Sequence, residues 1–326
     1  MIDYLTLANQ VISGKQIGKD EALSLINTSD EDTFLLLAAA NKMRQHFKNN
    51  KVKLCAIINA KSGKCPENCI FCGQSAHYNT KVMEYPLVDQ KEILNSAKNA
   101  KKDMKATCFS IVTSGKGSKN LDFDSICSSV SALENEVDIN RCTSIGTLTL
   151  EDAKKLKKAG LKKYHHNLET AESFFPNICT THKFSDRIET IKNAKEAGLD
   201  VCSGGIFGVG ESLEQRIELA FTLKELDVTS VPINILNPVK GTPAAENYKQ
   251  MTPLEVLRLI ATYRFVLPEK DIGIFGGREL ALRDLQPLLF IAGANVILVG
   301  NYLTTAGQSP EKDTQMIKDL GLEIEG

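Results

Sequence analysis

The chain has 326 residues, and its 39 Lys and Arg side chains nearly balance its 40 Asp and Glu side chains. Because there is no basic excess, nucleic acid is not expected as a partner, and no apolar run is long enough to cross a bilayer. The N-terminus lacks the basic-then-apolar pattern of a signal peptide, so we expect a cytoplasmic protein. In that reducing compartment, nine cysteines are more typical of metal or redox sites than of disulfides.

In chain order, residues 1–50 read as an N-terminal helical segment, and residues 51–326 as one domain with a C-terminal tail. In this domain, short apolar runs alternate with amphipathic segments of helix length. The apolar runs lie at residues 52–59, 106–113, 137–144, 161–167, 199–204, 228–234, 271–275 and 295–299. The intervening segments include 150–159 and 185–197, and a glycine follows each of them. Eight strand-then-helix units predict a (β/α)₈ TIM-type barrel, with an open doubly wound sheet as the alternative.

The strongest motif is the C-x₃-C-x₂-C pattern of Cys65, Cys69 and Cys72, directly after the first predicted strand. Three thiolates on one loop can hold three corners of a [4Fe-4S] cluster and leave the fourth iron without a protein ligand. The amino and carboxylate groups of S-adenosylmethionine (SAM) can chelate such an open iron, and the reduced cluster can then cleave SAM to a carbon radical. A zinc knuckle is the alternative, although zinc sites usually have a second cysteine pair farther on.

A second motif, Gly-Gly-Ile-Phe-Gly-Val-Gly-Glu, follows the fifth predicted strand at residues 204–211. Glycines let the backbone approach a ligand closely, although an ordinary turn has a similar composition. Together with the cysteine motif, this segment resembles the radical SAM superfamily, in which a G-x-I-x-G-x-x-E segment lies against the SAM adenine. The resemblance implies that Gly204, Gly205 and Ile206 bind the cofactor.

Further segments narrow the resemblance to the biotin synthase family and cover nearly the whole chain after residue 50. They are residues 65–75, 146–148, 164–170, 201–205, 231–234, 240–243, 277–279 and 292–295. The resemblance implies a sulfurtransferase that joins two unactivated carbons of dethiobiotin through one sulfur to give biotin. A 5′-deoxyadenosyl radical from SAM removes each hydrogen, and an auxiliary iron–sulfur cluster supplies the sulfur.

The same resemblance implies roles for individual polar residues. Asn167 and Glu169 match residues that hold SAM or substrate, and Arg187 matches an arginine near the SAM carboxylate. Asn234 matches an asparagine that contacts the substrate. His165 stands where the family usually has asparagine, near the ureido group of the substrate. We expect His165 either to contact dethiobiotin or to pack beside its neighbour.

The auxiliary site departs from the family pattern. The familiar enzyme holds a [2Fe-2S] cluster with three cysteines and an unusual arginine. Two of those cysteines match Cys142 and Cys202, whereas Ser110 and Gly273 stand in the other two places. A two-iron site of the usual kind is therefore not expected.

Two cysteines are gained beside the same site, Cys55 on the first strand and Cys108 on the second. Four thiolates now replace three thiolates and an arginine. We therefore predict a four-iron auxiliary cluster, able to carry an extra sulfide, on Cys55, Cys108, Cys142 and Cys202. The alternative is that the two gained cysteines are buried apolar residues, a common role for cysteine. Cys127 and Cys179 have no such match and are interpreted as structural.

Two rival functions remain open from the sequence. One is another radical SAM enzyme of similar barrel architecture, such as a hydrogenase maturase or a methylornithine-type mutase. The other is a non-catalytic iron–sulfur or zinc protein, although electron carriers usually complete all four cluster ligands from protein. The family resemblance further implies an electron donor of flavodoxin or ferredoxin type and a homodimer.

Overall fold

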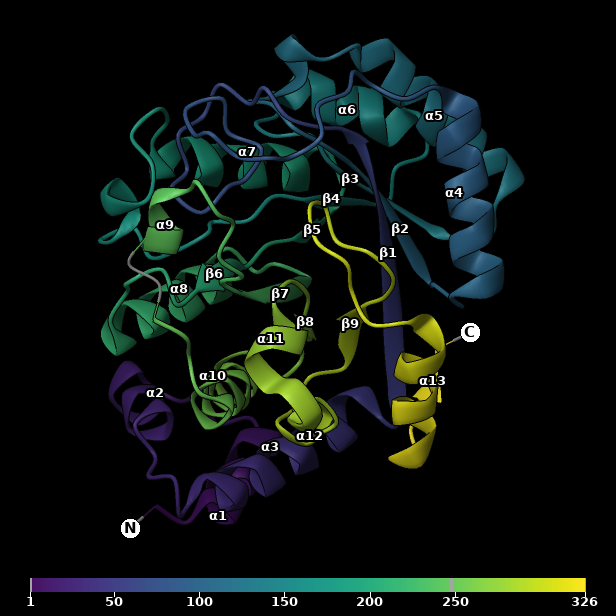
Figure 1. Cartoon of the computed structure of the whole chain (residues 1–326). Coiled ribbons are helices and arrows are strands. Elements are labelled where there is room, and N and C mark those ends of the chain that lie inside the picture. Colours follow the sequence, from purple (N-terminus) through teal and green to yellow (C-terminus); the bar gives the residue numbers. More distant parts are fainter. Residues whose placement is uncertain (1, 247–248, 326) are drawn as a thin grey trace.

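Residues 2–246 and 249–325 are described in a computed structural model, in which helices surround a barrel of parallel strands (Figure 1). The barrel strands are β1 (Lys51–Lys61), β2 (Cys108–Thr113), β3 (Asn140–Ser144), β4 (Lys163–His165), β5 (Asp200–Cys202), β7 (Ser230–Ile235), β8 (Asp271–Ile274) and β9 (Val296–Leu298). Neighbouring strands pair in this order, and β9 pairs back onto β1. This closure confirms the (β/α)₈ barrel and is incompatible with an open doubly wound sheet.

Two short strands extend the sheet. β6 (Gly205–Phe207) follows β5 after a break of two residues and pairs with β7. The fifth predicted strand therefore continues as a second segment beyond Gly204, where it had been expected to end. β10 (Glu323–Ile324) runs parallel to the first residues of β1, at the end of the barrel formed by the amino ends of the strands.

The helices that follow the strands form the outer layer. They are α4 (Gln90–Asp103), α5 (Phe123–Glu136), α6 (Leu150–Lys158), α7 (Phe184–Glu196), α8 (Leu213–Glu225), α9 (Pro243–Glu246), α10 (Pro253–Val266), α11 (Arg278–Leu282), α12 (Leu288–Ile291) and α13 (Pro310–Asp319). Short 3₁₀ turns lie at Ser118–Asn120, Phe175–Asn177 and Arg283–Leu285. The chain leaves α6 and α7 through Gly160 (φ +97°) and Gly198 (φ +77°), as the glycine stops predicted.

Three helices precede the barrel: α1 (Tyr4–Ile12), α2 (Lys19–Ile26) and α3 (Thr33–Lys48). They lie together at one end of the molecule, where α3 packs against α1, α10 and α12 (Figure 1). The buried face of α3 includes Leu36, Leu37, Ala40 and Met43. This apolar face explains the helical pattern in the first fifty residues.

The apolar core lies between the strands and the outer helices, not inside the barrel. Successive strand residues point to opposite faces, and the outward-facing ones include Leu54, Phe109, Tyr164, Val201 and Ile233, all 1% exposed or less. The alternate, inward-facing residues are largely cysteine, serine and other small or polar residues. A barrel interior of this kind leaves room for a ligand.

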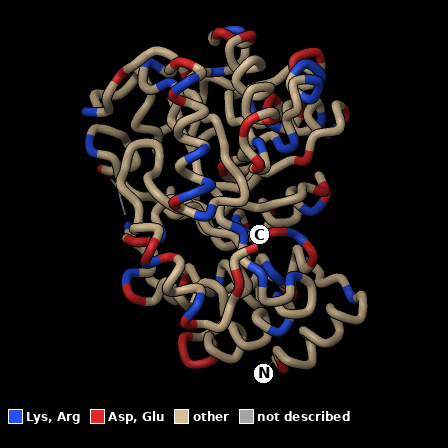
Figure 2. Tube along the Cα trace, turned by 90° about the vertical axis from the view of Figure 1, so that its right-hand side faces the viewer, with Lys and Arg blue, Asp and Glu red and all other residues tan. Residues whose placement is uncertain are grey.

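Among the described residues, no helix is both long and apolar enough to cross a membrane. Figure 2 shows basic and acidic residues interspersed along the trace, in keeping with a formal net charge of −1. The prediction that nucleic acid is not a partner rests on this balance.

Candidate active site

A cavity of about 580 Å³ occupies the interior of the barrel. It extends from Lys53 and Asp271, at the amino ends of β1 and β8, to the loops beyond the carboxyl ends of the strands. Chemistry in TIM-type barrels is located at those carboxyl ends. All seven cysteines predicted to bind clusters line this single cavity: Cys55, Cys65, Cys69, Cys72, Cys108, Cys142 and Cys202.

The loop after β1 carries the C-x₃-C-x₂-C motif, and protein contacts fold it. Cys72 N donates to Cys69 O at 3.0 Å, and Ala76 N donates to Cys65 O at 2.8 Å. The Tyr78 hydroxyl donates to Asn68 O at 2.5 Å. These hydrogen bonds fold the loop that carries the three cysteines at the cavity wall.

The thiols of Cys69 and Cys72 have raised pKa values and hold their protons tightly. Burial raises the pKa of Cys72 to about 11. The neighbouring Cys179 thiol, and then burial, raise the pKa of Cys69 well above its usual value. Metal binding must displace these protons, because the thiolate is the ligand form.

The spacing of the sulfur atoms distinguishes a cluster from a single zinc ion. Tetrahedral ligands about 2.3 Å from zinc would stand about 3.8 Å apart. In the part of the chain that the structure describes, the one group of three metal-ligating atoms within 4.8 Å of one another is Cys69, Cys179 and His182. The sulfur atoms of Cys65, Cys69 and Cys72 are not all within 4.8 Å of one another, which fits a multi-iron cluster better than a zinc knuckle.

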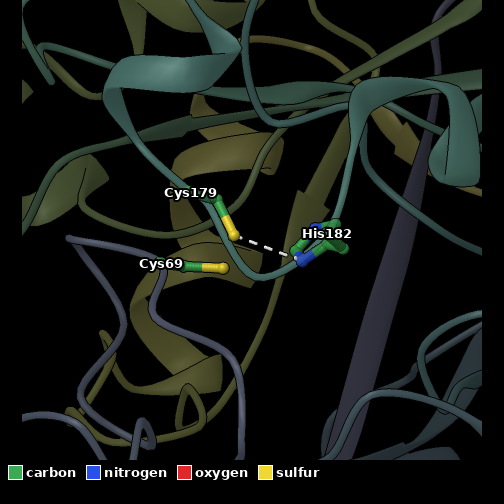
Figure 3. A group of neighbouring side chains, drawn as sticks. All are labelled: Cys69, Cys179 and His182. Carbon is green, nitrogen blue, oxygen red and sulfur yellow. Dashed lines mark hydrogen bonds between the residues drawn. The ribbon is translucent and has the colours of Figure 1, made fainter.

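Cys179 and His182 lie beside Cys69 (Figure 3). Cys179 Sγ is 3.2 Å from His182 Nδ1, and the Glu67 carboxylate contacts the same nitrogen. Arg187 Nε donates to His182 Nε2 at 3.0 Å, so Nε2 is the acceptor and Nδ1 carries the ring proton. A metal on Nδ1 would need that proton moved to Nε2, where it would face the Arg187 donor.

The group is therefore better described as a hydrogen-bonded network than as a separate metal site. Cys69 and partners such as His182 and Thr181 lower the pKa of Cys179 to about 3. Cys179, interpreted from the sequence as structural, thus contacts the cluster loop directly. Cys127, on α5, lies partly buried against the core, as a structural residue would.

The structure brings together the three polar residues predicted to hold SAM. Arg187, on α7, donates from Nη1 to Asn167 O at 2.8 Å, and it lies 3.6 Å from Glu169 Oε1. Glu169 has φ +70°, a left-handed conformation that is uncommon for residues other than glycine and is enriched at functional sites. All three side chains line the cavity.

The glycines of the second motif pack against backbone. A Cβ on Gly204 would lie 1.9 Å from Pro232 O, and one on Gly205 would lie 2.6 Å from Glu169 O. Gly204 N also donates to Asn167 Oδ1 at 3.2 Å. Ile206 lines the cavity. The two glycines thus position neighbouring strands, and their direct contact with a cofactor stays a prediction.

The two further residues predicted to bind substrate also line the cavity. His165 is the Cα partner of Cys202, and burial lowers the pKa of its ring to about 4, so the ring is neutral at pH 7. Asn234 Oδ1 accepts from Gly276 N at 2.9 Å, and its Nδ2 donates to Gly205 O at 3.3 Å. Their contacts with dethiobiotin stay predictions.

Three of the four inner cysteines lie on neighbouring strands deep in the barrel. Cys55 and Cys108 are Cα partners on β1 and β2, and Cys142 on β3 is the partner of Ser110, which shares a face with Cys108. Cys202 lies on β5, which is separated from β3 by β4. Hydrogen bonds from Cys142 and Cys55 lower the pKa of Cys108, which lies between them. Burial raises the pKa of Cys202 to about 11.

Two neighbours of these cysteines test whether a cluster fits. Ser110 is 9% exposed, and its Oγ has no hydrogen-bond partner within the described residues. A buried donor of this kind needs an acceptor, and cluster sulfur could supply one. Gly273 lines the cavity, but a Cβ on it would lie 2.7 Å from Phe275 Cε1 and 3.0 Å from Val296 Cβ, so these side chains occupy the place where the family arginine would begin. The Ser110 hydroxyl is the feature that fits a cluster on the inner cysteines.

Among the polar cavity residues that sequence reasoning missed are Glu67, His182 and Lys163. Burial alone would lower the pKa of Lys163, but Cys202, Cys108 and the other inner thiols raise it above its usual value. The two-residue strand period could have revealed Lys163, because it shares a face with His165 and Asn167. Glu67 and His182 lie on loops, and no sequence pattern marks their meeting.

Two family models together match most of the chain. The Radical SAM superfamily model matches residues 60–223. The Biotin and Thiamin Synthesis associated domain model matches residues 232–323. The first matched range includes both cysteine sets except Cys55, and the second includes strands β8 and β9.

Solved structures share the fold. A methylornithine synthase superposes with a TM-score of 0.86 at 20% identity, covering 98% of this chain and 97% of its own. An [FeFe]-hydrogenase maturase from Carboxydothermus hydrogenoformans has a TM-score of 0.82 at 20% identity, covering 98% of this chain and 79% of its own. Likeness at this level of identity shows the barrel architecture alone.

Sequence relatives are much more similar. The biotin synthase of Geobacter sulfurreducens is 51% identical, over 99% of this chain and 98% of the relative. That of Pelobacter propionicus is 50% identical, again over 99% of this chain and 98% of the relative. Identity at this level over the full length, together with both matched models, shows that the chain belongs to the biotin synthase family of the radical SAM superfamily.

Proposed function

We propose that this protein is a biotin synthase, which converts dethiobiotin to biotin by radical sulfur insertion. The observation that carries the proposal is that two separate sets of cysteines face one barrel cavity. A radical source and a sulfur source can thereby act on one substrate without its release. The full-length similarity to biotin synthases supports the same reaction.

In this proposal, Cys65, Cys69 and Cys72 hold a [4Fe-4S] cluster, and SAM binds beside it. When bound, the cluster supplies the electron that cleaves SAM to a 5′-deoxyadenosyl radical. Arg187 has Nε and Nη1 engaged by His182 and Asn167, so Nη2 is left to bind the SAM carboxylate. Backbone contacts of the folded loop hold the cysteines ready for the cluster and reduce its cost of ordering.

Asn167 and Glu169 are proposed to bind the polar groups of SAM, with Gly204, Gly205 and Ile206 supporting its adenine. The left-handed backbone of Glu169 aims its carboxylate into the cavity, and Ile206 N donates to Glu169 O at 2.7 Å. This contact ties the two predicted SAM segments together. Displacement of either segment should therefore affect SAM binding.

The inner cysteines are proposed to hold the sulfur donor: a four-iron auxiliary cluster, able to carry an extra sulfide, on Cys55, Cys108, Cys142 and Cys202. Their positions on β1, β2, β3 and β5, all facing one cavity, and the unpartnered Ser110 hydroxyl support a cluster held by all four cysteines. If Cys55→Ala and Cys108→Ala kept full auxiliary iron, the two cysteines would be ordinary buried residues.

Dethiobiotin is proposed to bind between the two cysteine sets, where His165, Asn167 and Asn234 line the wall. The neutral His165 ring can exchange hydrogen bonds with a ureido group without burying a charge. From the family, we further propose a homodimer and an electron donor of flavodoxin or ferredoxin type. Size-exclusion chromatography and reduction assays with each donor would check these two points.

The test of the function is product analysis. Anaerobically reconstituted, reduced enzyme should convert dethiobiotin and SAM to biotin, 5′-deoxyadenosine and methionine, as detected by mass spectrometry. Formation of 5′-deoxyadenosine without biotin would favour another radical SAM reaction, such as that of a maturase or mutase. Absence of both products would favour the alternative that the chain is a non-catalytic iron–sulfur protein.

A further inference from the structure

Lys163 is a cation of the barrel interior without a carboxylate partner. It is the first residue of β4, and its strand neighbours at the same level are Cys142 on β3 and Asp200 on β5. Its Nζ lies 3.4 Å from Ser230 Oγ. Within the described residues, no carboxylate oxygen lies within 4.0 Å of it. The ammonium group is therefore held by a neutral hydroxyl and by the field of the inner thiols, not by a carboxylate.

The other cations that line the cavity differ from Lys163. Lys53 pairs with Asp271 at 2.7 Å, and Lys116 lies 3.6 Å from Glu67. Arg187 lies 3.6 Å from Glu169. Lys162 has no carboxylate partner among the described residues, but its side chain is exposed to solvent. Partly buried Lys163 is therefore the cavity cation whose charge faces the inner thiols and, within the described residues, no carboxylate, so it can attract a further anion placed beside those thiols.

A second orphaned group faces the same space. Ser110 lies opposite Cys142 on the next strand, and its buried hydroxyl lies beside the Cys142 thiol but has no partner with full hydrogen-bond geometry within the described part of the chain. A single anionic acceptor near Cys142 could accept from both the Ser110 hydroxyl and the Lys163 ammonium. The chemistry required is that of a small anion that accepts hydrogen bonds at the inner cysteines.

We propose that Lys163 is a positioning residue that binds an inorganic sulfide anion beside the four inner cysteines, with Ser110 as a second donor. This inference rests on the proposed auxiliary cluster and adds to it the site of the sulfur held in excess of iron. Lys163 replaces the positive charge that the family arginine provides elsewhere in the barrel. Unlike an arginine fork, an ammonium is a compact charge suited to a monatomic anion.

The proposal predicts a selective loss of sulfide in Lys163→Met. In reconstituted protein, this change should weaken sulfide retention at least tenfold while the iron content stays constant. A residue with a purely structural role would lose iron and sulfide together.

The experiment uses the full chain with Cys65, Cys69 and Cys72 replaced by alanine, so that only the inner site can hold iron. Parent, Lys163→Met, Lys163→Arg and Lys162→Met proteins are reconstituted anaerobically with iron and sodium sulfide, then desalted. Iron, acid-labile sulfide and the rate of exchange with ³⁴S-sulfide are measured. Lys162→Met is the matched control, because it removes a neighbouring lysine that is exposed.

We expect the parent and Lys162→Met to retain sulfide in excess of iron, Lys163→Met to lose that excess, and Lys163→Arg to recover part of it. An unchanged sulfide-to-iron ratio in Lys163→Met would overturn the inference. Equal losses of iron and sulfide would overturn it as well, because Lys163 would then only neutralise the cluster. If the parent itself held no inner iron, the proposed auxiliary cluster would fail, and the inference with it.

Discussion

Replacing Gly204 with alanine should displace two residues of the candidate site, Asn167 and Asn234. The added Cβ would lie 1.9 Å from Pro232 O, whereas a carbon–oxygen contact needs about 3.3 Å, so the two strands must separate by roughly 1.4 Å. The Gly204 amide also donates to Asn167 Oδ1, so a shift of Gly204 moves Asn167. A shift of Pro232 moves Asn234, which follows it by two residues. A misplacement of this size costs roughly 10²-fold in rate, and overpacking costs about 1–3 kcal/mol.

The rates of 5′-deoxyadenosine and biotin formation measure the first effect, and thermal unfolding measures the second. For a chain of this length, the stability loss corresponds to a Tm decrease of roughly 2–4 °C. Ser203→Ala is the matched control: it alters the same strand break, adds no atom and removes a buried hydroxyl without a partner. Wild-type rates and Tm in Gly204→Ala would refute the reasoning.

Three more predictions follow from the site. Cys108→Ala should lose most of the auxiliary iron, whereas Cys127→Ala should keep it; equal iron in both would contradict the ligand assignment. His182→Ala removes the acceptor of Arg187 Nε and should raise the KM for SAM about tenfold with a smaller change in kcat; an unchanged KM would disprove the link. Burial gives His165 a folded-state pKa of about 4, below its unfolded value. As the pH falls through 6.5 towards 4, the unfolded chain takes up a proton that the folded chain does not, so the stability present at pH 7 is lost. Wild type should therefore lose about 2 kcal/mol more than His165→Asn between pH 7 and pH 5 in urea unfolding, and parallel losses would contradict this.

The barrel was predictable because its strands are short apolar runs separated by amphipathic helices, with glycine stops at Gly160 and Gly198. What the pattern could not predict was the closure, since pairing of β9 with β1 is a long-range contact without a local signal. The break after β5 was also missed. It depends on the close approach of Gly204 to the Pro232 carbonyl, which only the packed strands reveal.

The seven cysteines were predictable for different reasons. Cys65, Cys69 and Cys72 have a local spacing, whereas the four inner cysteines were found through the family resemblance and the two-residue period of strands. The contact of Cys179 with Cys69 and His182 was not predicted, because it joins two distant loops. Lys163 followed the strand period and was overlooked, since a lysine at the start of a strand usually faces solvent.

The most direct test of the central claim follows the sulfur atom. Enzyme whose inner site is loaded with ³⁴S-sulfide would be given dethiobiotin, SAM and a reductant, with unlabelled sulfide in the buffer, and the biotin from one turnover would be analysed by mass spectrometry. Labelled biotin is predicted, and none should form when Cys65, Cys69 and Cys72 are alanine. Biotin that carries unlabelled sulfur would contradict the claim that the inner cysteines hold the sulfur donor.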